Sequence, residues 1–110
     1  QLNSGCGAEH VQKTKTPPAN VTGSTSGRFC SVDGDADRLV YYFFVEGSLS
    51  LLDGDKIAAL MAGYLREQLS ESGLGLDVMV VQTAYANGAS TRYMRDAMKL
   101  TMDFGKTGVK

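Results

Sequence analysis

The fold of this chain is decided by residues 29–45, which carry the sequence FCSVDGDADRLVYYFFV. Leu39–Val45 is an unbroken run of β-branched, aliphatic and aromatic residues, which is typical of a buried strand. Residues 29–32 are a shorter run of the same kind and predict a second strand. The acidic segment between them, Asp33-Gly34-Asp35-Ala36-Asp37-Arg38, is expected to form a loop that joins the two strands.

The loop presents three carboxylates at alternate positions, Asp33, Asp35 and Asp37. On a turn between two strands, side chains in this pattern can converge on one cation, and the small residues Gly34 and Ala36 allow the backbone to fold around it. Carboxylate oxygens are hard ligands that select Mg²⁺ or Ca²⁺ over zinc. Without a cation, three clustered carboxylates would repel one another. The three aspartates are therefore predicted metal ligands, and the alternative is a solvated acidic turn.

Three kinds of acidic loop share part of this pattern. A calcium-binding EF-hand loop has the same first spacing, but it needs glycine at its sixth position and glutamate at its twelfth, where this chain has Arg38 and Phe44. Phosphatases of the haloacid dehalogenase type also place Asp-x-Asp after a strand, but Asp37-Arg38 does not fit their continuation. The metal loop of the α-D-phosphohexomutases has an arginine directly after its third aspartate, and this pattern fits all the loop positions.

The next part of the chain predicts a hairpin followed by a helix. Glu46-Gly47-Ser48 is a turn signal, and residues 49–52 can pair back on the preceding strand. A helix is expected over residues 55–69, with Asp55 as its N-cap. The helix has one apolar stripe at i, i+3, i+4, i+7 and i+8, formed by Ile57, Leu60, Met61, Tyr64 and Leu65.

The last third of the chain continues the alternation of strand and helix. It predicts a strand over residues 76–83, a helix capped by Ser90 with Met94 and Met98 in the core, and a weak strand over residues 101–104. The order of strand, strand, helix, strand, helix, strand indicates an α/β fold, with a mixed sheet and flanking helices. No convincing strand or helix precedes residue 29, so residue 1 is expected to fall inside a domain.

Composition and charge argue against several classes of protein. The 110 residues are 43% hydrophobic, enough for a small core, and their formal net charge of −1 supports neither a nucleic acid nor a membrane partner. The apolar runs are too short to span a bilayer. Cys6 and Cys30 form no CxxC pattern and are expected to be reduced thiols of a cytoplasmic protein, with a disulfide as the alternative. Gln1 is not an initiator methionine, which predicts a chain that was processed or cut from a longer one.

Five segments together resemble one family of the α-D-phosphohexomutase superfamily, the phosphoacetylglucosamine mutases. In the family's order they are Ser4-Gly5-Cys6-Gly7-Ala8, Asp33-Gly34-Asp35-Ala36-Asp37-Arg38, Asp53-Gly54-Asp55-Lys56-Ile57-Ala58, Gln82-Thr83-Ala84-Tyr85-Ala86-Asn87-Gly88 and Lys106-Thr107-Gly108-Val109-Lys110. The resemblance implies the latter part of a second, metal-binding domain over residues 1–74. It implies the first strand, helix and strand of a third, sugar-binding domain over residues 75–110, with the seam near Leu74-Gly75.

The resemblance also implies an activity. Members of the family are isomerases that interconvert N-acetylglucosamine 6-phosphate and N-acetylglucosamine 1-phosphate through a phosphoserine and a 1,6-bisphosphate, and their product feeds UDP-N-acetylglucosamine biosynthesis. By the same resemblance, Mg²⁺ is the cofactor, Asp33, Asp35 and Asp37 are its ligands, and Arg38 offers hydrogen-bond donors to the phosphorylated amino sugar. Lys106 is expected to contact the sugar and to assist proton transfer, and a solvated turn lysine is the alternative.

Three elements of the family are missing from these residues: the phosphoserine loop, the later sugar-recognition loop and the C-terminal phosphate-binding loop. The chain alone is therefore expected to be inactive, and its partners are expected to be the missing domains of the same chain. Two other functions stay open, which are a phosphoglucomutase or phosphomannomutase and a non-catalytic Mg²⁺-binding α/β module.

The remaining polar candidates are assigned structural roles. Asp53-Gly54-Asp55 looks like a second metal loop, but the next alternate position is the apolar Ile57, so helix capping is expected. Gly5-Cys6-Gly7 lacks a preceding strand and a lysine, so it is expected to be a tight turn and not a phosphate cradle. His10 is expected to hydrogen-bond locally, and Arg92 is expected to be a surface charge.

Overall fold

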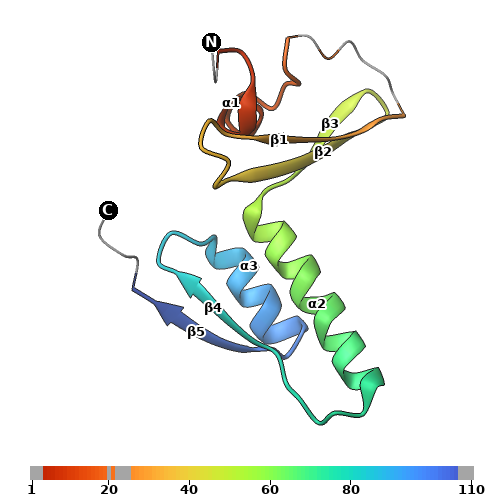
Figure 1. The fold of residues 1–110 in the computed structure, drawn as a ribbon, viewed down its shortest axis with the longest axis vertical. Helices are drawn as coiled ribbons and strands as arrows, with labels where there is room; N and C mark the ends of the chain where they lie inside the picture. Colours follow the sequence, from red (N-terminus) through yellow and green to blue (C-terminus); the bar gives the residue numbers. More distant parts are fainter. Residues whose placement is uncertain (1–3, 20, 22–25, 107–110) are drawn as a thin grey trace. The chain divides into compact units, whose positions relative to one another are not determined.

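The computed structural model describes residues 4–19, 21 and 26–106 and divides the chain into two compact units, Gln1–Gly54 and Asp55–Lys110. The first unit combines a helix with three strands, and the second combines two strands with helices (Figure 1). The α/β class expected from the sequence is confirmed, with the strands in two separate sheets.

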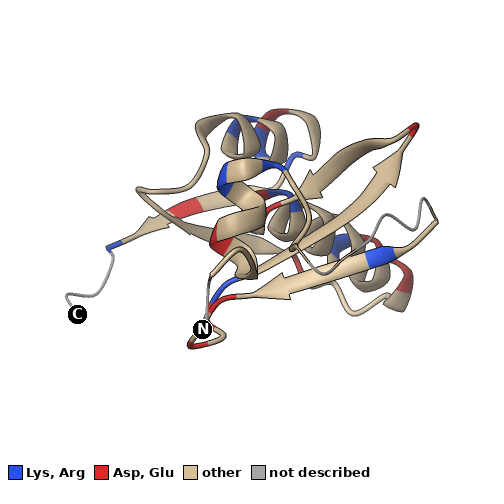
Figure 2. Ribbon diagram, turned by 90° about the horizontal axis from the view of Figure 1, so that it is seen from above, with Lys and Arg blue, Asp and Glu red and all other residues tan. Residues whose placement is uncertain are grey.

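Charged residues of both signs occur in both units, mostly on the helices and in the loops (Figure 2), whereas the strands over residues 39–45, 48–52 and 79–83 carry none. Within residues 4–19, 21 and 26–106, none of the helices combines the length and the apolar character that a membrane span requires.

The first unit is an antiparallel sheet with one helix packed on it. Its elements are α1 (Gly7–Thr14), β1 (Arg28–Val32), β2 (Leu39–Val45) and β3 (Ser48–Leu52). The strand order is β1-β2-β3, so the apolar run of β2 lies at the centre of the sheet. β1 and β2 pair from Arg28↔Phe43 to Val32↔Leu39, which places the acidic loop directly beyond the last pair.

The core of this unit lies where α1 meets the sheet. Val11 is fully buried, Tyr42 is 1% exposed, and the ring of Phe29 stacks on the ring of Tyr42 with centroids 5.5 Å apart. The complete buried cluster is Ala8, Val11, Val40, Tyr42 and Leu51. In β2 the buried residues alternate with less buried ones, so the continuous apolar run buries one face against α1.

A tight turn joins β2 to β3, as Glu46-Gly47-Ser48 predicted. Glu46 and Gly47 have φ angles of 50° and 79°. Two successive residues in the left-handed region form the kind of turn whose twist matches that of a two-stranded hairpin. Gly47 suits this position because it has no Cβ to clash with the backbone.

Gly47→Ala is expected to lower the free energy of unfolding by about 1 kcal/mol, because an L side chain is strained in the left-handed region. A Cβ added at Gly47 meets nothing within 4 Å, so the cost comes from the backbone and not from a clash. Gly54→Ala is the matched control, since Gly54 has equally open surroundings without a positive φ. Denaturant titration of both variants measures the difference, and equal losses in the two would contradict the explanation.

The expectation that no helix precedes residue 29 is wrong, because α1 spans Gly7–Thr14. Its N-cap Cys6 is extended, and the glycines on either side, Gly5 and Gly7, have φ angles of 63° and 89°. Only Ala8 and Val11 of this helix are buried. Two apolar anchors are too few to produce a helical period, so the helix depends on packing against the sheet, which sequence periodicity does not reveal.

The second unit is a parallel pair of strands with helices against it. Its elements are α2 (Gly54–Ser72), β4 (Met79–Thr83), α3 (Gly88–Arg92), the π-helical segment η1 (Tyr93–Ala97) and β5 (Thr101–Gly105). β4 and β5 pair from Met79↔Thr101 to Thr83↔Gly105. α3 and η1 form the crossover that a parallel connection requires.

The core of the second unit is formed by Ala62, Met94 and Leu100, with Met98 among the partly buried residues around it. The prediction that Met94 belongs to the core is confirmed, whereas Met98 packs against this core and is only partly buried. α2 contributes small residues to this contact, and a Cβ added at Gly63 would lie 2.9 Å from Met98 Cε. Larger side chains of the predicted stripe are exposed, namely Leu60, Met61, Tyr64 and Leu65. The face of α2 that packs here is therefore the alanine and glycine face.

Both helix starts in this unit differ from the prediction. α2 begins at Gly54, so Asp55 lies in the first turn, where its Oδ2 accepts a hydrogen bond from the backbone N–H of Asn87 at 3.0 Å. α3 begins at Gly88, and its N-cap is Asn87 and not Ser90, because the Oδ1 of Asn87 accepts the Ala89 N–H at 2.8 Å. Asn and Ser are comparably good N-caps, so the sequence alone does not choose between them.

The division between the units falls at Gly54/Asp55, whereas the seam was expected near Leu74-Gly75. The physical reason is that Ala62 of α2 shares a buried cluster with Met94 and Leu100, which follow it in the chain. α2 therefore belongs with the strands after it and not with the antiparallel sheet before it.

Candidate metal centre

The acidic loop is fixed at the end of the β1–β2 ladder by backbone hydrogen bonds. The Asp33 N–H donates to the Arg38 carbonyl at 3.3 Å, and the Ala36 N–H donates to the Asp33 carbonyl at 3.1 Å. Ala36 itself has a φ of 58°, in the left-handed region that residues with a Cβ rarely adopt. The loop therefore reverses direction within a few residues and keeps its acidic side chains together.

The three predicted ligands, Asp33, Asp35 and Asp37, converge in the structure. One carboxylate oxygen from each lies within 4.8 Å of the others. A Mg²⁺ ion with oxygen ligands at about 2.1 Å holds neighbouring oxygens about 3 Å apart and opposite oxygens about 4 Å apart. The cluster thus fits such an ion after a small closure. Asp33 is buried while Asp35 and Asp37 are exposed, so the solvent side of the cluster is open to water or to a ligand oxygen.

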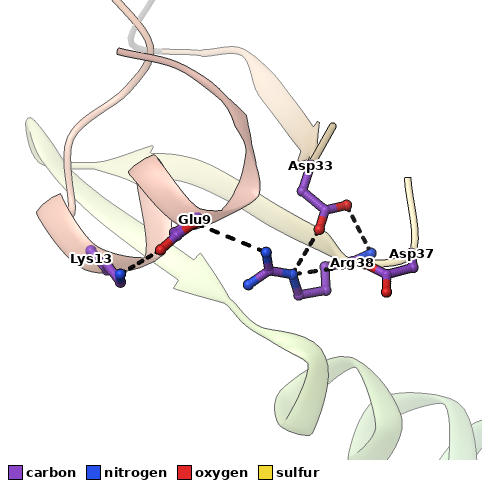
Figure 3. A network of polar contacts seen from close by, with 5 residues as sticks. All are labelled: Glu9, Lys13, Asp33, Asp37 and Arg38. Carbon is purple, nitrogen blue, oxygen red and sulfur yellow. Dashed lines mark hydrogen bonds and ion pairs between the residues drawn. The ribbon is translucent and has the colours of Figure 1, made fainter. Parts of the chain in front are cut away.

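Arg38 forms an ion pair with the buried member of the cluster (Figure 3). Its Nε lies 2.7 Å from Asp33 Oδ2, and its backbone N–H donates to Asp33 Oδ1 at 3.1 Å. The side-chain hydrogen bond from Arg38 is the main reason that the pKa of Asp33 falls from 3.8 to about 2, against the opposing effect of burial. Asp33 is therefore ionised at neutral pH, as a metal-ligating carboxylate must be.

The Arg38 guanidinium also lies near two further carboxylates. Its Nη2 lies 4.0 Å from Oε2 of Glu9 on α1, and its Nε lies 3.8 Å from Oδ1 of Asp37. Glu9 also pairs with Lys13, one turn further along α1, and this contact is the main cause of the lowered pKa of Glu9. The Arg38 side chain nevertheless keeps 57% of its surface exposed, so a ligand can still reach it.

Comparison with known proteins identifies the family. Residues 53–110, more than half of the chain, match the family model described as phosphoacetylglucosamine mutase AMG1, domain III. The chain belongs to the phosphoacetylglucosamine mutase family. The family resemblance expected from the sequence is confirmed.

Curated members of the family align over the whole chain. The phosphoacetylglucosamine mutases of Sus scrofa and Homo sapiens are each 50% identical over 100% of the chain, which covers 20% of either relative. The chain therefore spans about a fifth of the length of these mutases. The match of the family model from residue 53 agrees with the placement of α2 in the second unit.

Solved structures of the family share the fold. An Aspergillus fumigatus N-acetylphosphoglucosamine mutase, described in complex with GlcNAc-6P and magnesium, is 44% identical with a TM-score of 0.84, over 97% of this chain and 21% of that one. An N-acetylglucosamine-phosphate mutase in the apo form is 39% identical with a TM-score of 0.81, over 96% of this chain and 24% of that one.

The remaining sequence candidates lie outside the acidic cluster. Lys106 is exposed and directly follows β5 in the second unit, while residues 107–110 of its motif lie outside the described residues. Asp55 lies in the first turn of α2. His10 is part of α1, where its carbonyl accepts a hydrogen bond from the Thr14 hydroxyl at 2.7 Å, and Arg92 is exposed at the end of α3.

Glu9 is a neighbour of the acidic loop that the sequence did not predict. Glu9 precedes Arg38 by a long stretch of chain and lies on the helix that periodicity did not reveal. The spacing of Glu9 and Lys13, four residues apart, is the one local signal that could have indicated this helix.

Proposed function

We propose that this chain is the magnesium-binding part of an isomerase that interconverts N-acetylglucosamine 6-phosphate and N-acetylglucosamine 1-phosphate through a phosphoserine and a 1,6-bisphosphate. The observation that carries the proposal is the cluster of Asp33, Asp35 and Asp37 on a hydrogen-bonded loop. Support comes from the relative that was solved with GlcNAc-6P and magnesium.

In this proposal the three aspartates hold Mg²⁺ through one oxygen each. When bound, the ion would neutralise negative charge on the phosphoryl group during its transfer. Asp33 keeps its charge because Arg38 stabilises the ionised form, and the exposed Asp35 and Asp37 adjust to the ion's geometry. The cluster fits Mg²⁺ because its donors are hard carboxylate oxygens, with room left for water or phosphate oxygens.

Arg38 and Lys106 are assigned to the substrate. The Arg38 side chain is more than half exposed, so its guanidinium fork can donate to phosphate oxygens or sugar hydroxyls. Lys106 extends into solvent directly after a strand end and offers a mobile point charge for the sugar phosphate and for proton transfer.

Two other functions compete with this one. A phosphoglucomutase or phosphomannomutase would use the same metal loop on a different sugar, and a non-catalytic module would bind Mg²⁺ without turnover. The names of the curated relatives favour the acetylated amino sugar.

The test of the function uses the full-length protein. We expect it to convert N-acetylglucosamine 6-phosphate into the 1-phosphate, observed by ³¹P NMR, to lose this activity on chelation and to regain it with Mg²⁺. Faster turnover of glucose or mannose 6-phosphate would favour the first alternative. Magnesium binding without turnover of any hexose phosphate would favour the second.

The 110 residues assayed alone are expected to show no mutase turnover, because the resemblance assigns the phosphoryl-carrying serine to a loop that they do not contain. The measurement is formation of N-acetylglucosamine 1-phosphate by the purified fragment with Mg²⁺ and added 1,6-bisphosphate. A full-length relative under the same conditions serves as the positive control. Measurable product from the fragment would contradict a multi-domain active site.

A further inference from the structure

The turn over residues 84–87 places a tyrosine where parallel strands end. It follows β4 directly, and Tyr85 within it is 87% exposed, the highest value among the exposed large hydrophobic residues of the described chain. An aromatic ring held in water is unfavourable by itself, because its burial would be worth a few kcal/mol. The position of Tyr85 therefore needs a reason outside the packing of this unit.

The turn that carries Tyr85 is well ordered by hydrogen bonds. On one side of Tyr85, the Ala86 N–H donates to the Thr83 carbonyl at 3.0 Å. On the other, the Asn87 N–H donates to Asp55 Oδ2 at 3.0 Å, which ties the turn to the start of α2. Asn87 also caps α3. Tyr85 is thus presented by a fixed backbone and not by a loose loop.

A buried side-chain hydrogen bond connects the two elements on either side of this turn. The Thr91 hydroxyl donates to Gln82 Oε1 at 2.6 Å, and both residues are buried. This bond joins β4 to α3 across the turn, so the strand and the helix on either side of Tyr85 are held together. A ring on such a turn keeps its place at little conformational cost when a ligand binds.

The edge that presents Tyr85 also presents Lys106. β4 and β5 are parallel and end in register at Thr83↔Gly105, so the segments after both strands leave the sheet at the same edge. Lys106 is the first residue beyond β5 and is exposed. In α/β structures, ligands bind outside the carboxyl ends of parallel strands. An exposed aromatic ring and a cation at one such edge suit a ligand with a carbon ring and an anionic group.

We propose that Tyr85 is a substrate-contacting residue whose ring packs against the carbon face of the hexosamine. The inference rests on the proposed function, which supplies a sugar phosphate as ligand. The C–H face of a pyranose is apolar enough to lie on an aromatic ring, while its phosphate is the part that suits Lys106. The contact is made with the ring, so the Tyr85 hydroxyl contributes little.

The test compares three variants of the full-length protein with N-acetylglucosamine 6-phosphate as ligand. Tyr85→Ala is expected to raise KM about tenfold with kcat nearly unchanged, because a contact present in both ground and transition states is lost. Tyr85→Phe keeps the ring and should stay within about twofold of the parent. Tyr93→Ala is the matched control and should leave KM unchanged, since Tyr93 is also exposed in the second unit but lies on η1, which leads to the start of β5 and not away from a carboxyl end.

Two further measurements separate this inference from other readings of Tyr85. Calorimetric titration with N-acetylglucosamine 6-phosphate should give the same tenfold loss in affinity for Tyr85→Ala, and the Tm and the Mg²⁺ affinity should not change. An unchanged affinity, an equal loss in Tyr85→Phe, or a lowered Tm that indicates packing against another part of the chain would overturn the inference. If the parent binds the sugar phosphate without turnover, the proposed reaction fails while this titration still decides the role of Tyr85.

Discussion

Asp35→Ala in the full-length protein is expected to weaken Mg²⁺ binding by at least about a hundredfold, since changes to residues that merely support metal ligands already cost 10- to 100-fold. Asp35 is exposed at the middle of the loop, so its removal leaves the buried Asp33 and the backbone turn intact. Turnover should fall with Mg²⁺ occupancy, because the ion is proposed to neutralise the transferring phosphoryl group. Calorimetric Mg²⁺ titration measures the first effect, and substrate kinetics over a series of Mg²⁺ concentrations measures the second.

Two variants control for charge and for general damage. Asp35→Asn keeps an oxygen ligand without the charge and should fall between the parent and Asp35→Ala. Asp77→Ala removes another exposed acidic residue, in the second unit, and should leave Mg²⁺ binding unchanged. If Asp35→Ala bound Mg²⁺ as tightly as Asp77→Ala does, the cluster would be a solvated acidic turn and the metal assignment would fail.

The parts of the fold that the sequence predicts are those with a strong local signal. The apolar run of β2 is found at the predicted residues, Leu39–Val45, and the turn after it is where Glu46-Gly47-Ser48 indicated. α1 gives no such signal, because two buried residues in a short helix do not establish a period. The large apolar residues of α2 do form a stripe at helical spacing, but this pattern does not predict whether another element packs against the stripe.

The spacing of the acidic residues along the sequence predicts which of them form the candidate site, but not how deeply each is buried or which charged residues contact it. Alternation on a tight loop brings Asp33, Asp35 and Asp37 together, and the structure agrees. The unequal burial of the three aspartates depends on packing, and it makes Asp33 the one that needs a charged partner. The contact of Arg38 with Glu9 depends on the position of α1, so it could not be predicted from the loop alone.

Arg38→Ala is expected to lower kcat/KM for the sugar phosphate by about 30- to 1,000-fold, the range for loss of one partner in a charge-assisted contact. The effect on Mg²⁺ affinity should stay within about threefold, because two consequences oppose each other. Without the ion pair between Arg38 Nε and Asp33 Oδ2 at 2.7 Å, the Asp33 carboxylate can rotate away from the ion, which weakens Mg²⁺ binding. Loss of a neighbouring positive charge reduces repulsion of the ion, which strengthens it.

The conservative variant and the metal titration together assign the role of Arg38. Arg38→Lys should recover only part of kcat/KM, since an ammonium group cannot hold Asp33 through Nε and present a fork to the substrate at the same time. Substrate kinetics of both variants, at Mg²⁺ concentrations that saturate each, separate loss of the sugar phosphate contact from loss of the ion. If Arg38→Ala lost Mg²⁺ as severely as Asp35→Ala while keeping its affinity for the sugar phosphate, Arg38 would act by holding Asp33 for the metal and not by contacting the substrate.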